Sequence, residues 1–313
     1  MIRHTLEGER PGGLSPFENL VFPMSTQAFQ DQVWQREIAY FKGDLDRATQ
    51  VISLDEYLTA LFEAGIGTPR LLYRHPSHSD PEAAMDAFFR LKASWTAPPT
   101  ADELAKSIAG GTLVFNDIGR RLSSANTWCQ QVFRTTGWTV QINSYFGASF
   151  GASAFDQHFD NHDVFILQLA GQKDWHLWEA PEPSNGAEFA DCPVPKGDAD
   201  QVARLTPGDI LYVPKRRWHW PKTLEGGPSV HLTVQLRPQR PMEVLYWLEH
   251  VLAERAREDK TLETACGLTG ALDAGEGLER AIAVLKDELS SADAKQRAEL
   301  HLTVKRMNRM FGR

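Results

Sequence analysis

The chain has 313 residues, of which 33 are Lys or Arg and 41 are Asp or Glu, so its formal net charge is −8. Hydrophobic residues make up 42% and charged residues 24%, the balance of a folded globular chain, which argues against wholesale disorder. An acidic chain repels phosphate backbones, so we expect no nucleic-acid partner. No apolar run reaches the roughly 18 residues of a membrane span, and the first residues contain no apolar signal segment. We therefore expect a cytoplasmic protein that has no membrane partner.

Cysteine usage adds one more exclusion. The three cysteines are an odd number, are widely spaced and form no CxxC motif: Cys129, Cys192 and Cys266. This pattern argues against a disulfide framework and against a zinc site built from thiolates.

The first part of the sequence contains helix-capping residues and apolar residues at helical spacing. Ser25 is a candidate N-cap, and Ser53 precedes an acidic first turn and a run of apolar residues at helical spacing. A further helix is predicted to begin at Pro81, and another over residues 123–135. The short run 112–115 is instead β-prone. We expect region 1–110 to be mostly helical and to pack on the domain that follows.

From residue 139 the pattern changes to that of short strands bounded by Gly and Pro. The predicted strands are Thr139–Phe146, Val164–Leu169, Asp174–Trp178, Ile210–Val213 and Val230–Leu236. Because no long helices separate them, we expect an antiparallel sandwich or barrel in region 111–240.

After Pro241 the pattern is helical again. Apolar residues form three stripes, which begin at Val244, Leu278 and Leu300. Three stripes are more than one catalytic domain needs to cover itself, so we expect segment 241–313 to pair two copies in a symmetric homodimer.

Three polar residues in this part of the chain could share one metal ion. His158 and Asp160 flank Phe159 on extended chain, so their side chains can point to the same side. His219 follows the strand that begins at Ile210. Two histidines and one carboxylate can occupy one face of an octahedron, which is typical of non-haem Fe(II) oxygenases. By itself, however, an HxD pattern is more often a hydrogen-bonded pair at the surface.

The surrounding sequence resembles a known family. The run from Gln157 to Trp175, QHFDNHDVFILQLAGQKDW, is similar to the iron-binding core of the JmjC/cupin-type 2-oxoglutarate oxygenases, in the bacterial branch resembling ribosomal oxygenases. Residues 207–220 resemble the family's distal-histidine segment, and residues 229–234 the strand after it. The resemblance implies a mainly β, α+β fold. Its core would be a double-stranded β-helix (jelly-roll, cupin) with N-terminal helices and a C-terminal helical segment.

The resemblance also implies roles for particular residues. His158, Asp160 and His219 match the iron triad of the family. Lys173 lies fifteen residues after the first ligand, where the family places a cation that pairs with the distal carboxylate of 2-oxoglutarate. The alternative for Lys173 is an exposed lysine after a tight turn at Gly171.

Two hydroxyl residues match positions beside the same carboxylate. Tyr145 resembles a tyrosine that hydrogen-bonds it, and Thr233 fits the position of a small hydroxyl residue next to it. Both are also ordinary strand residues. If Thr233 faces the pocket, His231 approaches it too, because residues two apart on a strand share a face.

The other candidates in the motifs have structural interpretations. We expect local hydrogen bonding from His162 and Asp163, and a sheet position for His176. Asn143 is as suited to capping a turn as to lining the pocket. Trp218 and Trp220 flank a predicted ligand, so they could shape the cavity, although large aromatic residues usually serve the core.

The function implied is an Fe(II)/2-oxoglutarate-dependent dioxygenase that uses O2 to hydroxylate an amino-acid side chain in a peptide or protein. The same chemistry could serve a small-molecule hydroxylase or an N-methyl-lysine demethylase. A non-catalytic metal-binding cupin and a zinc-dependent cupin isomerase are disfavoured by Lys173, because neither needs to clamp a cosubstrate. Two departures bear on the substrate: loop 146–155 lacks the family's Pro-rich version, and the segment after Pro241 is too short for a winged-helix domain.

Overall fold

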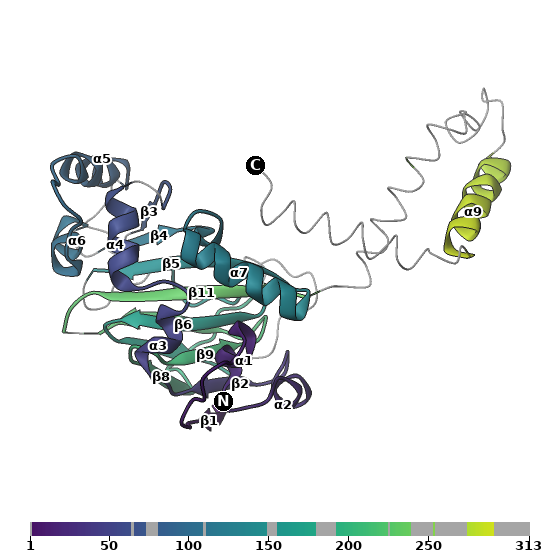
Figure 1. Cartoon of the computed structure of the whole chain (residues 1–313), viewed down its shortest axis with the longest axis horizontal. Coiled ribbons are helices and arrows are strands. Elements are labelled where there is room, and N and C mark those ends of the chain that lie inside the picture. The colour runs from purple at the N-terminus through teal and green to yellow at the C-terminus, as the bar shows by residue number, and fades with distance from the viewer. Residues whose placement is uncertain are drawn as a thin grey trace. The chain divides into compact units, whose positions relative to one another are not determined.

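The computed structural model describes residues 2–63, 66–72, 81–108, 111–148, 155–179, 192–224, 226–238, 253 and 274–290 (Figure 1). The chain divides into two compact units, Met1–Arg237 and Pro238–Arg313. In the part of the chain that the structure describes, no helix is both long and apolar enough to cross a membrane.

Two helices in the first unit begin at the caps that the sequence predicts. The side chain of Ser25 accepts a hydrogen bond from the backbone N–H of Ala28 at 3.1 Å, and Ser53 forms a capping box with Glu56. The helices of this unit are α1 (Pro16–Val21), α2 (Thr26–Gln32), α3 (Leu45–Thr49), α4 (Leu54–Phe62), α5 (Pro81–Lys92), α6 (Ala101–Ser107), the 3₁₀ turn η1 (Ile118–Arg120) and α7 (Ser123–Thr136).

Two sheets form the centre of this unit. The large sheet has the order β1-β2-β9-β6-β11-β5-β4-β3 and the small sheet β10-β7-β8, and every pairing except β1 with β2 is antiparallel. The strands are β1 (Ile2–Leu6), β2 (Ile38–Phe41), β3 (Arg70–Leu72), β4 (Thr112–Phe115), β5 (Thr139–Gly147), β6 (Val164–Ala170), β7 (Lys173–Leu177), β8 (Gln201–Leu205), β9 (Ile210–Val213), β10 (His219–Thr223) and β11 (Ser229–Arg237).

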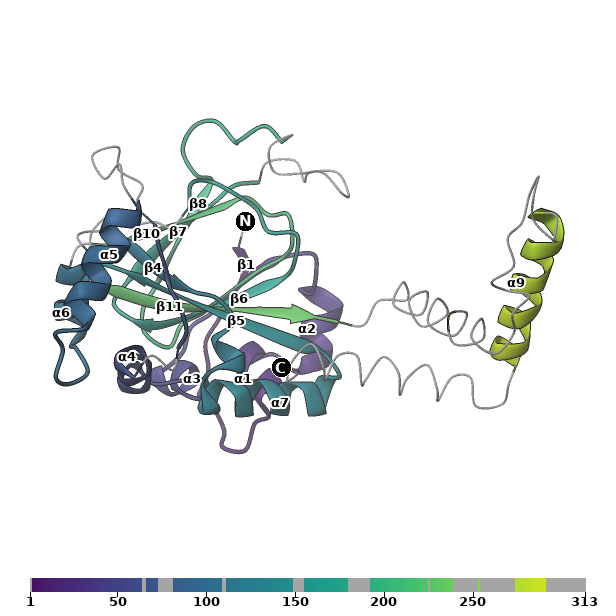
Figure 2. The ribbon, with the colours of Figure 1, turned by 90° about the horizontal axis from the view of Figure 1, so that it is seen from above.

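The large sheet is covered on both faces. Figure 2 shows α1, α3, α4 and α7 on one side of it and the small sheet on the other. On the helix side, the ring of Phe29 packs on Phe165 and Tyr212, with centroids 5.5 Å and 5.0 Å apart. Between the sheets, Ile166 and Trp175 belong to one buried apolar cluster. Because both faces are buried, β6 is apolar at every position except Gln168 and does not alternate, which explains why its sequence predicts a strand so clearly.

The chain passes from the large sheet to the small one at a glycine. Gly171 separates β6 from β7 and has a φ of +63°, a left-handed conformation that favours glycine. A Cβ at this position would overlap the carbonyl oxygen of Pro228, so a larger residue is also excluded sterically. This turn brings the first residue of β7, Lys173, into the space between the sheets.

All five predicted strands are present, but the sequence pattern missed five others: β1, β2, β3, β8 and β10. Three of these lie in region 1–110, which was expected to be mostly helical. His219 was placed just beyond a strand, whereas it is the first residue of β10. Pro221 argues against a strand in the sequence, because proline cannot donate a backbone hydrogen bond within a sheet. It is tolerated in β10 because β10 is an edge strand.

In the second unit the structure describes one helix, α9 (Ala274–Ser290), which contains the stripe that begins at Leu278. Its Ile282 side chain is exposed. The stripes that begin at Val244 and Leu300 lie outside the described residues.

Candidate metal centre and cavity

The backbone brings two of the three candidate metal ligands together. His158 and His219 form an isolated antiparallel bridge, in which each backbone N–H donates to the other's carbonyl oxygen, at 3.0 Å and 2.8 Å. This pairing leaves the centroids of the two imidazole rings 4.3 Å apart. Two residues distant in the sequence therefore become neighbours through main-chain hydrogen bonds.

Hydrogen bonds at the far side of each ring set its orientation. Nδ1 of His158 lies 2.7 Å from the carbonyl oxygen of Asp156, and Nδ1 of His219 lies 2.9 Å from that of Arg217. Because a carbonyl can only accept, each Nδ1 carries a hydrogen, and in the neutral form of the ring the lone pair lies on Nε2. This is how metal-binding histidines are usually held.

Asp160 completes the group. Its Oδ2 lies 3.7 Å from Nε2 of His219, and one donor atom from each of His158, Asp160 and His219 lies within 4.8 Å of the others. Burial, and after it the neighbouring His158, lowers the pKa of His219 to about 4, so the imidazole is neutral at physiological pH. Neutral imidazoles and a carboxylate are the donor set of a facial triad, and the residues present therefore fit an iron ion.

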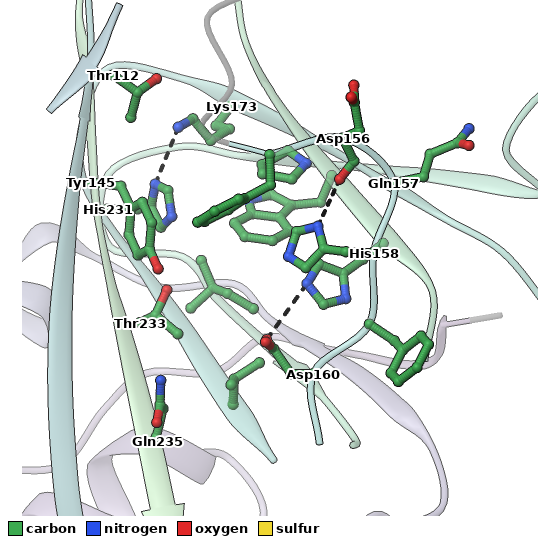
Figure 3. A pocket seen from close by; sticks show the side chains of 17 residues that line it. Thr112, Tyr145, Asp156, Gln157, His158, Asp160, Lys173, His231, Thr233 and Gln235 are labelled. Carbon is green, nitrogen blue, oxygen red and sulfur yellow. Dashed lines mark hydrogen bonds and ion pairs between the residues drawn. The ribbon is translucent and has the colours of Figure 1, made fainter. Parts of the chain in front are cut away.

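The triad lies on the wall of a cavity of about 530 Å³ (Figure 3). The volume is in the usual range for small-molecule sites. Six strands contribute to its lining: β4, β5, β6, β7, β10 and β11. Besides the triad, the polar or ring-bearing side chains in it include Thr112, Tyr145, Lys173, Trp175, His231, Thr233 and Gln235.

Lys173 is buried in this lining, with 1% of its surface exposed, so it is not the exposed turn lysine of the alternative interpretation. Among the described residues no carboxylate forms an ion pair with it, and its Nζ lies 3.2 Å from Nδ1 of His231. Burial lowers its pKa to about 7. A buried cation without a counter-charge is costly, so this end of the cavity is suited to an anionic ligand.

A second polar group at this end of the cavity is a threonine hydroxyl. The hydroxyl of Thr112 is buried, and it has no hydrogen-bond partner in the described part of the chain. Figure 3 shows it beside the ammonium group of Lys173. Buried polar groups normally have partners, so an unsatisfied hydroxyl in a cavity wall again indicates a ligand.

Tyr145 and Thr233 line the same cavity. Burial raises the pKa of Tyr145 to about 12, with a smaller contribution from the negative charge of Asp160, so its hydroxyl remains a donor. Figure 3 shows the hydroxyls of Tyr145 and Thr233 close together, on the side of the tyrosine ring away from Lys173.

Thr112 is one of the lining residues that the sequence did not predict, as are Trp175 and Gln235, whereas His231 was expected in the pocket on the condition that Thr233 faces it. His231 shares the face of Thr233 on β11, so the period-two pattern was a usable signal for it. Thr112 lies on a short strand far from the motifs, and nothing in the local sequence marks it.

The other motif residues have structural contacts. Asp163 accepts hydrogen bonds from the hydroxyl of Tyr212 and from Nε2 of Gln35, both at 2.9 Å. His176 packs on Trp220, with ring centroids 5.5 Å apart, and is not part of the cavity lining. Nor is Trp218, which packs on Phe159 in a separate buried cluster.

Two further expectations concern Asn143 and the loop before His158. Asn143 accepts a hydrogen bond from the backbone N–H of Asp117 at 2.9 Å, so it caps a turn. Residues 149–154 of the loop expected to border the substrate opening lie outside the described residues. Phe155, at its end, lines the cavity and is 39% exposed.

Comparison with known proteins agrees with this geometry. Residues 121–244 match the JmjC domain. Bovine ribosomal oxygenase 2 is 31% identical over 254 residues, a match that covers 73% of this chain and 48% of that protein. The chain therefore spans about half the length of this relative.

Solved structures agree on the fold. The structure of E. coli ycfD has a TM-score of 0.53 at 16% identity and covers 88% of this chain and 70% of that one. A structure of the E. coli ribosomal oxygenase YcfD in complex with cobalt and 2-oxoglutarate has a TM-score of 0.50 at 14% identity, and covers 90% of this chain and 71% of that one. The predicted family resemblance and the α+β fold with a JmjC/cupin core are confirmed.

Proposed function

We propose that this chain, which carries a JmjC domain of the ribosomal-oxygenase branch, is an Fe(II)- and 2-oxoglutarate-dependent dioxygenase. Its reaction would hydroxylate an amino-acid side chain in a peptide or protein. One observation carries the proposal. A buried lysine without a carboxylate partner among the described residues shares a cavity with a His–Asp–His group. A metal-binding scaffold would have no use for such a lysine, whereas a dicarboxylate cosubstrate needs it.

In this proposal, different residues bind the metal and the cosubstrate. His158, Asp160 and His219 would hold the metal, each through one donor atom. When bound, iron supplies O2 activation coupled to the decarboxylation of 2-oxoglutarate to succinate and CO2. Lys173 pairs with the distal carboxylate and thereby fixes the direction in which the cosubstrate enters.

The remaining lining residues orient the ligand and exclude water. The hydroxyls of Tyr145 and Thr233 belong to residues of the same cavity wall and are available to the cosubstrate there. Val164 and Ile166 line the cavity with apolar side chains, which keeps water from the reacting groups. The exposed ring of Phe155 is a candidate contact for the substrate at the opening.

The segment that follows the catalytic domain is assigned a separate role. We propose that the chain is organised as 1–110, 111–240 and 241–313, and that the last segment pairs two copies in a homodimer. The start of a second compact unit at Pro238 supports the boundary before the last segment, and the exposed Ile282 side chain on α9 supports its role in pairing.

The test begins with turnover of the chain loaded with Fe(II). We expect succinate release that depends on 2-oxoglutarate and O2, and that is lost in His219→Ala. Proteins and peptides incubated with the enzyme are then analysed by mass spectrometry, where a product heavier by one oxygen atom is expected. A heavier product found only among free small molecules would move the substrate to that class, and loss of a methyl group as formaldehyde would indicate demethylation. Absence of both 2-oxoglutarate binding and succinate release would refute the proposal.

A further inference from the structure

The nitrogen partner of Lys173 belongs to the opposite sheet. Lys173 is the first residue of β7 in the small sheet, and His231 lies on β11 in the large sheet. Their side chains meet in the interior, with Nζ and Nδ1 3.2 Å apart, as the dashed line in Figure 3 shows. Both residues are buried, at 1% and 2% exposure. The contact is therefore sequestered from solvent.

Two aromatic neighbours fix the His231 ring. It stacks on Tyr145 with a centroid separation of 4.8 Å and an interplanar angle of 3°, and it meets Trp175 edge-on at 5.3 Å and 87°. These two contacts fix the plane of the ring. Of the two orientations that keep this plane, the hydrogen bond to Lys173 selects the one with Nδ1 toward the lysine.

The chemistry of the two groups sets the direction of the hydrogen bond. A protonated lysine can only donate, so Nδ1 of His231 accepts and the ring hydrogen lies on Nε2. Burial, and after it the charge of Lys173, lowers the pKa of His231 well below its ordinary value, which keeps the ring neutral. An ammonium group has three hydrogens. One is used by His231, and two remain for a ligand in the cavity.

We propose that His231 is a positioning residue for the cosubstrate, an inference that rests on the proposed function. His231 holds the ammonium group of Lys173 so that the two remaining hydrogens of that group face the distal carboxylate of 2-oxoglutarate. The site would thereby favour a 2-oxo acid with a second carboxylate over one without it. Thr112 supports the same arrangement, because its hydroxyl has no hydrogen-bond partner among the described residues, and the residue lines the same cavity as Lys173, where the hydroxyl can donate to that carboxylate.

Binding of the dianion is then coupled to a proton. Burial holds the pKa of the empty-site lysine at about 7, so at higher pH most of the sites contain the neutral amine. A carboxylate beside it raises this pKa, so the site takes up one proton as the ligand binds, and affinity falls as pH rises above about 7. The polar groups near Lys173 on the elements packed against it are the hydroxyls of Thr112 on β4 and Thr223 on β10 and the imidazole of His231 on β11. The hydroxyl of Tyr145 on β5 lies on the side of its ring away from Lys173, and the carboxylates in the cavity lining are those of Asp156 and Asp160.

A matched pair of substitutions separates positioning from packing. His231→Phe keeps a flat ring against Tyr145 but removes the acceptor, whereas His231→Asn keeps an acceptor near Nδ1 but removes the stacked ring. Each full-length variant is loaded with Fe(II) without oxygen and titrated with 2-oxoglutarate. Pyruvate serves as the control probe, because it is a 2-oxo acid that lacks the distal carboxylate.

We expect His231→Phe to weaken 2-oxoglutarate binding about tenfold or more, the loss typical of a hydrogen bond to a charged group, and to leave pyruvate binding unchanged. His231→Asn should keep most of the 2-oxoglutarate affinity. The reverse order, with the Phe variant normal and the Asn variant weak, would overturn the proposal because it would show that only the ring packing counts. Equal loss of affinity for both probes would overturn it as well, because that pattern indicates a general collapse of the cavity.

The pH dependence of 2-oxoglutarate binding is a second measurement, and a purely structural role of His231 would not change it. Between pH 7 and 9 the dissociation constant of 2-oxoglutarate should rise for the wild type and stay flat for Lys173→Arg, because a guanidinium remains charged throughout. A flat wild-type profile would refute the proton coupling. Failure of the wild type to bind 2-oxoglutarate would instead remove the proposed function, and this inference with it.

Discussion

Replacement of Lys173 by Met tests the site most directly. The substitution keeps an unbranched side chain of similar length in the buried position and removes the positive charge. Losing one partner of a buried ion pair costs on the order of 3–5 kcal/mol, so 2-oxoglutarate should bind more than a hundredfold more weakly. Fe(II) affinity should be nearly unchanged, because Lys173 is not part of the metal group.

The same substitution should stabilise the empty protein. The difference between an ordinary lysine pKa of 10.5 and about 7 corresponds to about 5 kcal/mol of unfavourable burial at low pH. Between pH 7 and 10 the unfolded chain holds a proton that the folded chain lacks, so wild-type stability from this group rises with pH. Below about pH 7 both states are protonated, and the penalty is constant and largest.

Two assays check these expectations. Calorimetric titration of 2-oxoglutarate into the anaerobic, Fe(II)-loaded variant measures binding, with Lys173→Arg as the control that keeps the charge and part of the affinity. Urea unfolding of the metal-free proteins at pH 7 and pH 9 measures stability. Wild-type 2-oxoglutarate affinity in Lys173→Met, or a variant less stable than the wild type at pH 7, would refute the reasoning.

Four further predictions follow from single contacts. His219→Ala should abolish Fe(II) binding and leave the far-ultraviolet circular dichroism unchanged; retained metal binding would exclude His219 as a ligand. Thr112→Val removes an unsatisfied buried hydroxyl, so the unfolding midpoint should not fall, while the 2-oxoglutarate dissociation constant should rise about threefold to tenfold in calorimetry. Asp163→Ala leaves the hydroxyl of Tyr212 without its acceptor, so urea unfolding should show a loss of about 1–3 kcal/mol, and an unchanged midpoint would contradict this. Ile282→Glu on α9 should shift a dimer toward monomer in size-exclusion chromatography with light scattering, and a wild-type monomer would refute the dimer.

Local sequence patterns were sufficient for much of the scaffold. Ser25 and Ser53 mark helix starts through interactions within one turn, and the run of β6 is apolar enough to identify a buried strand. Local signals failed where a strand depends on its neighbours. β1 and β8 have partly exposed burial patterns and find their places through pairing with β2 and β7, while Pro221 masks β10.

The candidate site divides in the same way. The residue types and their spacing were enough to nominate His158, Asp160, His219 and Lys173, because a metal triad and a cosubstrate cation are chemical requirements that a motif can record. The sequence by itself left open whether Lys173 is exposed or buried. Only the tertiary structure placed it between two sheets, paired the backbones of His158 and His219, and set His231 against the lysine. The physical reason is that burial and hydrogen-bond partners arise from strands that are distant along the chain, whereas periodicity and motifs describe only what neighbours in sequence can do.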